Sequence, residues 1–400
     1  AVDNLKLRAS WGESPDDEPL SGGQFYLGYN YGGGSYVFNP GSLTAGLNPN
    51  VEPNYILTYS KSRITNIGFD AGLFNNLLTL NVDAFYRKRS GLPATRASIS
   101  IPSTAGISLP QENLKSDEIR GFEIALTYNK TINDFSFSIA PNISYKQARN
   151  VHIEQSPFNS QWSNFLGNTI NRNKNILIGY DYAGQFQTME EIANSPVQDN
   201  NANKTLLPGD LKYVDLNNDG VINSQDRKVI GRGLNPDVFY GMNLYAAWKG
   251  FDLSILLQGA SNYSTYFGNE IQRPFFNGGN TYDYFTDRWH REDIYDPNSA
   301  WVAGKYPSTR LNGTDNNSLL SSFWVTNAYY MRIKNVDLGY SFNTKWLEKA
   351  NIKGLRIYTS TSNLFTLTNV KYIDPEVTDE SIQGRYYPQQ RVISFGIQAK

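Results

Sequence analysis

The residues best suited to chemistry in this chain lie in one segment, from Asp215 to Asp226. Side chains that carry oxygen occupy its first, third, fifth, ninth and twelfth positions, a glycine is sixth and an isoleucine is eighth. This spacing is that of a calcium-binding loop of the EF-hand type. The predicted ligands are the side chains of Asp215, Asn217, Asp219, Asn223 and Asp226 and the backbone carbonyl of Val221.

Each position of this segment has a physical task. Gly220 allows the sharp turn around the ion, and Ile222 anchors the loop on apolar neighbours. The twelfth position is an aspartate, not a glutamate, which is the pattern of dockerin-like extracellular modules and weakens bidentate ligation. The alternative is an Asn/Asp/Gly-rich turn that binds no ion. The expected role of a bound Ca²⁺ is to stiffen a surface loop, not to catalyse.

The sequence contains few residues of the types that other metal sites or catalytic sites require. There is no cysteine, so disulfides, thiolate metal sites and cysteine nucleophiles are excluded, and there are only two histidines, His152 and His290. Adjacent acids at 190–191 and 292–293 resemble acid/base pairs, but adjacent acids in polar loops are usually solvated. We therefore expect no enzymatic activity.

Aromatic side chains in the polar stretches are the weak candidates for substrate binding. Tryptophan rings can stack on sugar rings or contact a partner protein. The alternative is that they pack the loops onto each other. The candidates are Trp162, Trp289, Trp301 and Trp324.

Composition restricts the class of protein. The formal net charge is −1 and no basic patch or stripe is visible, so nucleic acid is not an expected partner. No apolar run approaches the ~18 residues that a membrane-spanning helix needs. A β-barrel is compatible with these facts, because half of each barrel strand is polar.

The elements that position these residues are strands with a period of two. Leu78, Leu80 and Val82 alternate with Thr79 and Asn81, so one face is apolar and the other polar. Several strands run ten residues or more, which is long for a soluble sheet but suits a tilted membrane crossing. Aromatic residues gather near the strand ends, as in the girdles of a barrel. Ten crossings are predicted near 2–12, 58–74, 77–90, 116–129, 134–147, 237–249, 251–262, 326–342, 354–368 and 390–400.

Short and long connections between these strands follow each other in turn. The short ones are at 75–76, 130–134, 249–250 and 343–353, and the long ones are at 13–57, 91–115, 148–235, 263–325 and 369–389. Strand-like residues at 176–187 are assigned to a hairpin inside the longest loop. The pattern predicts an all-β fold, an antiparallel transmembrane β-barrel whose loops 148–235 (with the calcium-like segment 215–226) and 263–325 are extracellular. The alternative is a soluble β-sandwich or propeller.

Motifs spread along the chain, from residue 1 to residue 400, resemble the C-terminal barrel half of SusC/RagA-like TonB-dependent transporters of Bacteroidetes. Each motif is weak, but their shared order is specific. One segment, 330–340, reads Tyr-Met-Arg-Ile-Lys-Asn-Val-Asp-Leu-Gly-Tyr. The others are at 114–129 (with 119–124 at its centre), 213–231, 235–253, 288–289, 306–307, 322–324, 362–365, 374–377 and 387–388.

The resemblance implies a function that the residues alone do not. Members of this family carry an N-terminal plug inside a barrel of about 22 strands, of which this chain would supply about ten. They import glycan or peptide oligomers across the outer membrane of Gram-negative bacteria, with a SusD-like surface lipoprotein as a lid. TonB, powered by ExbB and ExbD, acts on the N-terminal region, to which no residue here is assigned. The alternative is a soluble extracellular β-domain that is stabilised by calcium and binds carbohydrate.

Two further expectations concern the ends and the interior. No signal peptide precedes the first strand, and the last residues lack the usual terminal aromatic, so we expect a partial chain. The in-facing polar residues Asp83, Glu123, Asn142 and Asp252 are expected to line a lumen or face the plug.

Overall fold

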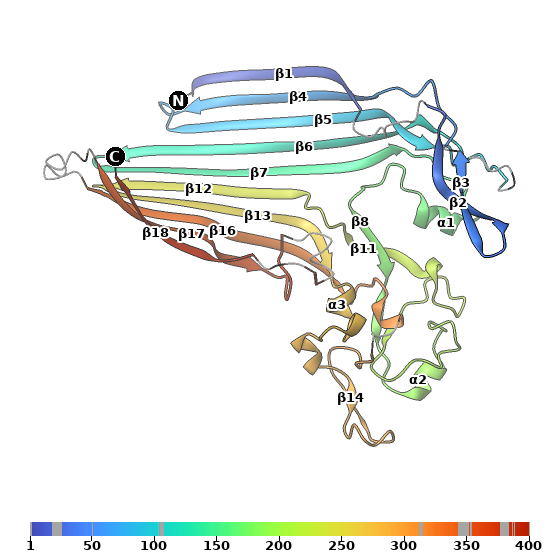
Figure 1. Cartoon of the computed structure of the whole chain (residues 1–400). Coiled ribbons are helices and arrows are strands. Elements are labelled where there is room, and N and C mark those ends of the chain that lie inside the picture. The colour runs from blue at the N-terminus through green and yellow to red at the C-terminus, as the bar shows by residue number, and fades with distance from the viewer. Residues whose placement is uncertain are drawn as a thin grey trace.

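One ten-stranded antiparallel sheet dominates the computed structural model of this chain (Figure 1). The structure describes residues 2–17, 26–49, 51–102, 104, 108–311, 315–342, 352, 354–376, 384–385, 387 and 389–399. The strands follow one another across the sheet in chain order, each antiparallel to the next. They are β1 (Val2–Asp16), β4 (Ser60–Leu73), β5 (Leu78–Thr95), β6 (Gln111–Ile132), β7 (Phe135–His152), β12 (Val238–Trp248), β13 (Phe251–Tyr266), β16 (Val325–Phe342), β17 (Leu355–Thr368) and β18 (Val392–Ala399).

These ten strands confirm the ten predicted crossings, with different lengths at the loop end. The sequence pattern ends the third and begins the fourth crossing at 90 and 116, where Gly91 and Pro93 interrupt the alternation. In the structure β5 and β6 continue to Thr95 and Gln111. A shift of register around Leu92 absorbs the irregular residues, so that the ladder resumes beyond them.

One face of the sheet is apolar and uncovered. The register places Leu7, Phe69, Val82, Ile124 and Ile143 side by side on a single row. Leu7 is 79% exposed, and at the other edge of the sheet Phe395 is 84% exposed. No described element covers this face, whereas the core of a soluble sandwich buries such a row between two sheets. The soluble sandwich or propeller is therefore wrong, and the antiparallel barrel wall is confirmed.

The opposite face carries polar and charged side chains that pair across strands. Arg8 contacts Asp70 at 2.9 Å and Asp83 at 2.8 Å between its guanidinium nitrogens and their carboxylate oxygens. Arg356 likewise contacts Asp252, at 3.0 Å from Nε, and Asp337. The charges on this face neutralise one another. Such a face suits contact with water or other protein, because charged groups are costly in lipid.

Tight turns and long loops lie at opposite ends of the sheet (Figure 1). The tight turns and both chain ends share one end. Phe74, Asn75 and Asn76 have positive φ values of 57°, 60° and 57°, which asparagine tolerates better than most residues. The predicted short connection at 343–353 lies almost wholly outside the described residues.

The long connections contain small elements of their own. The first holds the hairpin of β2 (Tyr29–Asn39) and β3 (Ser42–Pro49). The connection from β7 to β12 contains α1 (Gln161–Gly167), β8 (Ile176–Tyr180), β9 (Tyr182–Gln185), α2 (Met189–Ala193), β10 (Leu211–Tyr213), η2 (Ser224–Asp226) and β11 (Arg227–Arg232). The connection from β13 to β16 contains α3 (Asn269–Gln272), η3 (Phe276–Gly278), η4 (Asp283–Thr286), β14 (His290–Arg291), β15 (Trp301–Val302) and η5 (Asn316–Ser318). No helix among the described residues has the length and apolar character to cross a membrane.

The strand predicted at 176–187 is present but is divided at Asp181. Its halves do not pair with each other: β8 pairs with β11, and β9 pairs with β10. Both partners come from residues 211–232: β10 precedes the calcium-like segment and β11 follows it. Residues 176–185 therefore pair with the chain on both sides of that segment.

A charge placed on the apolar face should destabilise the protein far more than one on the polar face. We expect Val82→Arg to cost about 2–4 kcal/mol of unfolding free energy in lipid vesicles. Ser144→Arg is the matched control, because its side chain lies on the polar face directly opposite Glu123. The measurement is denaturant unfolding of the full-length protein that contains this chain. Equal costs for the two variants would contradict the assignment of the faces.

Candidate functional site

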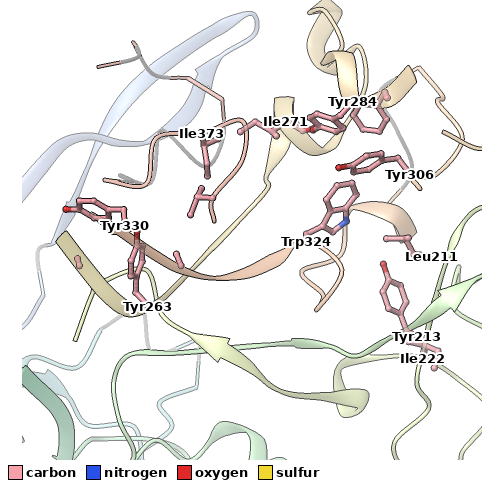
Figure 2. Close-up of a cluster of buried hydrophobic side chains, with 14 residues drawn as sticks. Leu211, Tyr213, Ile222, Tyr263, Ile271, Tyr284, Tyr306, Trp324, Tyr330 and Ile373 are labelled. Atoms are coloured by element: carbon pink, nitrogen blue, oxygen red, sulfur yellow. The ribbon is translucent and has the colours of Figure 1, made fainter. Parts of the chain in front are cut away.

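The long loops pack into one aromatic core at the end of the sheet (Figure 2). Its rings are close: the centroid of Tyr284 lies 4.7 Å from that of Tyr306 and 4.6 Å from that of Tyr372. Three separate connections and the ends of β13 and β16 contribute to it. The buried members are Leu211, Tyr213, Ile222, Ala260, Tyr263, Ile271, Tyr284, Phe285, Tyr306, Trp324, Ala328, Tyr330, Val370 and Ile373.

The buried tyrosine hydroxyls of this loop core are neutral over the physiological pH range. Burial raises the pKa of the Tyr306 hydroxyl to about 12, and it raises the pKa values of Tyr213 and Tyr284 as well. The Tyr213 hydroxyl donates to the backbone carbonyl of Asn316 at 2.7 Å. That bond joins the loop after β7 to the loop after β13.

A buried carboxylate reinforces the same junction. Asp210 is fully buried and accepts hydrogen bonds from Arg310 at 2.6 Å, from the Asn317 side chain at 2.8 Å and from the backbone of Leu207 at 2.8 Å. Because a buried charge is tolerated only when paired and hydrogen-bonded, this group holds the two loops in one arrangement. The loops therefore form a single body, which we call the loop assembly.

The calcium-like segment is bound to this assembly through Ile222. Ile222 is buried in the loop core, and its amide donates to the carbonyl of Val197 at 2.8 Å. Val197 in turn donates to the carbonyl of Gly220 at 2.9 Å. Gly220 has φ of +80°, which suits the sharp turn that the sequence assigns to it.

The oxygens of the predicted ligands are partly engaged in hydrogen bonds, and Asn217, Asp219 and Val221 are exposed. Asp215 accepts the amide of Gly220 through Oδ2 at 2.8 Å, while its Oδ1 is buried and has no hydrogen-bond partner. Asp219 accepts the amide of Val221 and the Asn217 side chain, each at 2.9 Å. The orphaned Oδ1 is the observation that fits a cation, because a buried carboxylate oxygen needs a partner.

Asp226, at the twelfth position, joins the two ends of the segment by accepting backbone amides. Asp226 is fully buried and accepts the amides of Leu216 and Asn223, at 2.9 and 2.8 Å. Asn223 caps η2 in the reciprocal arrangement of a capping box. Within the described residues, no three or more His, Cys, Asp or Glu side chains converge as a metal cluster. Any ion at this segment would therefore depend on amide and backbone oxygens as well.

The four candidate tryptophans are not alike. Trp289 and Trp324 are 5% and 3% exposed, and their indole nitrogens donate to Gln185 at 3.2 Å and to the Asn317 carbonyl at 2.8 Å. Packing between loops thus accounts for both of these rings. Trp162 and Trp301 are half-buried: Trp162 lies against Phe165, and the Arg291 guanidinium lies 4.3 Å from the ring centroid of Trp301.

A charged network that the sequence pattern did not reveal fixes the last long loop to the sheet. Arg332 of β16 has a side chain only 3% exposed, and it contacts Asp374 at 2.9 Å and Glu376 at 3.1 Å. Lys334 contacts Glu376 at 2.8 Å. We call these four residues the latch. In the sequence, the latch is visible only as two cations, two residues apart, and two acids, two residues apart, in a later segment. Such pairs are too common to predict a contact between them.

The latch carboxylate stays ionised despite its burial. Burial alone would raise the pKa of Glu376, but hydrogen bonds from Lys334 and Gln389 and the positive charges of Arg332 and Lys334 outweigh burial and lower it. The segment 369–376 is also held by the Tyr263 hydroxyl, which donates to the carbonyl of Pro375 at 2.5 Å.

The residues that resemble catalytic groups have local structural partners. His152 pairs with Glu154 at 3.1 Å, and His290 contacts the carbonyl of Arg288 at 2.9 Å. Glu191 accepts the amide of Gln187 and the Lys212 ammonium. Each of these bonds organises a loop.

Comparison with known families identifies the kind of wall that this sheet builds. A family model described as "TonB dependent receptor-like, beta-barrel" matches residues 1–253. A TonB-dependent receptor of Formosa agariphila is 27% identical over 410 aligned residues, which cover 90% of this chain and 38% of the receptor. The TonB-dependent receptor SusC of Bacteroides thetaiotaomicron is 24% identical over 350 residues, which cover 86% of this chain and 32% of SusC.

Solved structures show the same fold. The structure of the RagAB peptide transporter superposes with a TM-score of 0.70 at 18% identity, and the match covers 100% of this chain and 41% of that one. RagAB in an open-open state gives the same TM-score at 20% identity. The chain thus spans about two-fifths of the length of the relatives it matches, or somewhat less.

Removing the latch cation should free the last long loop. We expect Arg332→Met to raise amide hydrogen exchange in residues 370–376 by about a hundred-fold to a thousand-fold, because it leaves two carboxylates without their buried partner. Lys371→Met is the matched control, since Lys371 lies exposed in the same segment. Equal protection in both variants would show that the latch does not hold the loop.

Acid should release the same segment. The pKa of Glu376 is lower in the folded protein than the ordinary value of about 4.3, so its contribution is complete above that pH and is lost as the pH falls through the folded value. We expect pepsin cleavage within 369–391 to rise steeply below about pH 4. Glu376→Gln should show a flatter pH dependence, and an unchanged slope in that variant would exclude Glu376 as the titrating group.

Proposed function

This chain belongs to the family of TonB-dependent receptor-like β-barrels, and we propose that it forms part of the wall of an outer-membrane transporter that imports glycan or peptide oligomers. The observation that carries the proposal is the division of the sheet into an uncovered apolar face and a paired, polar one. A membrane barrel needs both, because lipid touches one side of every strand and water or protein touches the other.

The proposed location is the outer membrane of a Gram-negative bacterium. An open sheet of ten strands leaves backbone groups at two edges, which hydrocarbon cannot satisfy. The proposed barrel therefore closes with further strands, about twenty-two in all by resemblance to the family. The loop assembly would then face outward from the cell, and the tight turns would face the periplasm.

The proposed partners follow from that orientation. A SusD-like lipoprotein would cover the loop assembly, whose rigid core offers a preformed surface. TonB with ExbB and ExbD would act through a region outside this chain. Trp162 and Trp301, the half-buried pair, are the candidates for contact with cargo or lid. One solved relative is a peptide transporter, and both peptide and glycan remain within the proposal.

The calcium-like segment contributes a local part of the proposal. Asp215, Asn217, Asp219, Val221, Asn223 and Asp226 would hold Ca²⁺, and the ion would supply a partner for the orphaned Oδ1 of Asp215. The anchoring of the segment to the loop assembly by Ile222 and Val197 supports this proposal. A bound ion would stiffen the outward surface where a lid docks.

Transport can be tested by deleting the gene and measuring uptake. We expect the mutant to lose uptake of either labelled peptide oligomers or labelled oligosaccharides, and to recover it when the full-length gene is restored. The two cargo classes serve as each other's control for general damage to the envelope. Normal uptake and growth on every peptide and glycan tried would contradict the proposal.

Calcium can be tested without any transport assay. We expect a chelator to increase protease cleavage within 197–232 of the full-length protein, and added Ca²⁺ to reverse it. Asp215→Ala with Asp219→Ala should abolish the difference between chelator and calcium. Asp283→Ala with Asp315→Ala, in the neighbouring long loop, is the control and should retain it. If cleavage of the unmodified protein were the same with chelator and with added Ca²⁺, the proposed calcium site would be wrong.

A further inference from the structure

A row of charged side chains borders the apolar face at its loop end. Five cations on β4, β5, β6 and β7 and two carboxylates on β1 and β6 belong to it, and we call it the outer rim. Its members are Lys61, Arg63, Lys88, Arg120, Arg149, Glu13 and Glu118.

The strand register places the outer rim on the same face as the exposed apolar residues. Glu13, Arg63, Lys88, Glu118 and Arg149 are successive partners across β1, β4, β5, β6 and β7. Each lies an even number of residues from the apolar members of its own strand. Lys88, for example, is six residues beyond Val82, so both side chains leave the same side of the sheet.

Aromatic side chains mark the level directly below this row. Trp11, Tyr86 and Arg120 share one row, and the next row toward the loops holds the other charges from Glu13 to Arg149. Both aromatic rings are exposed. From Leu78 to Tyr86 the strand rises about 26 Å along its axis, or about 20 Å along the membrane normal at the usual tilt. That height is close to the apolar band of outer-membrane barrels, so the outer rim lies at headgroup level.

The outer rim has more positive charge than its own carboxylates can neutralise. Glu13 is shared by Arg63 at 2.6 Å and Lys61 at 3.6 Å, and Glu118 pairs with Arg149. No carboxylate of the described residues forms an ion pair with Lys88 or Arg120. Arg120 instead donates to the neutral side chain of Gln147. Lys61 and Arg63 remain 61% and 57% exposed.

The excess of cations on β4 to β7 is not continued on β12 or β17. At the loop ends of β12 and β17 the residues on the same face are Val238 and Leu367, which are uncharged. At the opposite border of the apolar band, Lys130 and Lys249 are cations of the described strands and turns, and Lys249 lies 3.9 Å from Asp134. The outer rim is therefore a distinct basic surface over four neighbouring strands.

We propose that the outer rim binds the phosphate of an anionic lipid headgroup in the outer leaflet. Guanidinium and ammonium groups at headgroup depth attract phosphate strongly, and Arg63 and Arg120 can donate forked hydrogen bonds to it. The apolar row below accepts the acyl chains of the same molecule, so the surface matches a lipid better than a free ion. The proposal rests on the orientation in the proposed function, in which the loops face outward.

The test is lipid binding to the detergent-solubilised full-length protein, measured by native mass spectrometry. The probe is monophosphoryl lipid A, and the same lipid after phosphatase treatment is its matched partner. We expect Lys88→Gln with Arg120→Gln to weaken binding of the phosphorylated lipid by about thirty-fold, since two cations near the headgroup are lost. These two residues form no ion pair within the described chain, so the fold should survive, and far-UV circular dichroism checks it.

The control variant is Lys130→Gln with Lys249→Gln at the opposite border, which should bind as the unmodified protein does. Three results would overturn the proposal: equal binding by the outer-rim variant, equal binding of the dephosphorylated lipid, or displacement of the lipid by millimolar inorganic phosphate. Binding in detergent does not depend on import. A protein that binds the lipid but imports nothing would contradict the proposed function alone.

Discussion

The hydrogen-bond ladder that joins ten strands in sequence order is the interaction on which the rest of the structure depends. In hydrocarbon an unpaired backbone amide or carbonyl costs several kcal/mol, so a wall that faces lipid must pair every strand with its neighbours. Once the ladder is set, side chains alternate strictly, and one register fixes both faces. Val82 then faces outward because Asp83 faces inward, and a slip of one residue would exchange them.

The polar face uses that same register to neutralise its charges. Arg8 meets Asp83 only because two successive pairings bring β1, β4 and β5 into line, and Arg356 meets Asp252 across β16 in the same manner. The loop assembly extends this logic beyond the sheet, since the latch ties residues 374 and 376 to β16. The loop assembly is thus tied to the sheet by pairs that the ladder has positioned.

Local pattern was enough to predict the strands and their order but not the contacts between distant residues. Alternation such as that of residues 77–88 marks a strand by itself, and asparagines at 75 and 76 mark a tight turn, because both signals are local. The partner of Asp83 and the burial of Trp289 depend on chain segments 75 and more than 100 residues away. The division of 176–187 at Asp181 likewise follows from pairing with residues 211–232. For the calcium-like segment, the turn at Gly220 and the anchor at Ile222 were predictable from spacing. The turning of Asp226 toward backbone amides was not.

The central claim is that the apolar side of each strand touches lipid while its reverse side does not. This chain has no cysteine. Single cysteines introduced at each position from 78 to 86, in a full-length protein free of other cysteines, can carry a nitroxide spin label in vesicles. The account predicts that relaxation by oxygen, which dissolves in lipid, is high at the even positions. Relaxation by a water-soluble nickel complex should be low at those positions. A uniform profile, or nickel access at Leu80 and Val82 equal to that at Asn81 and Asp83, would contradict the account.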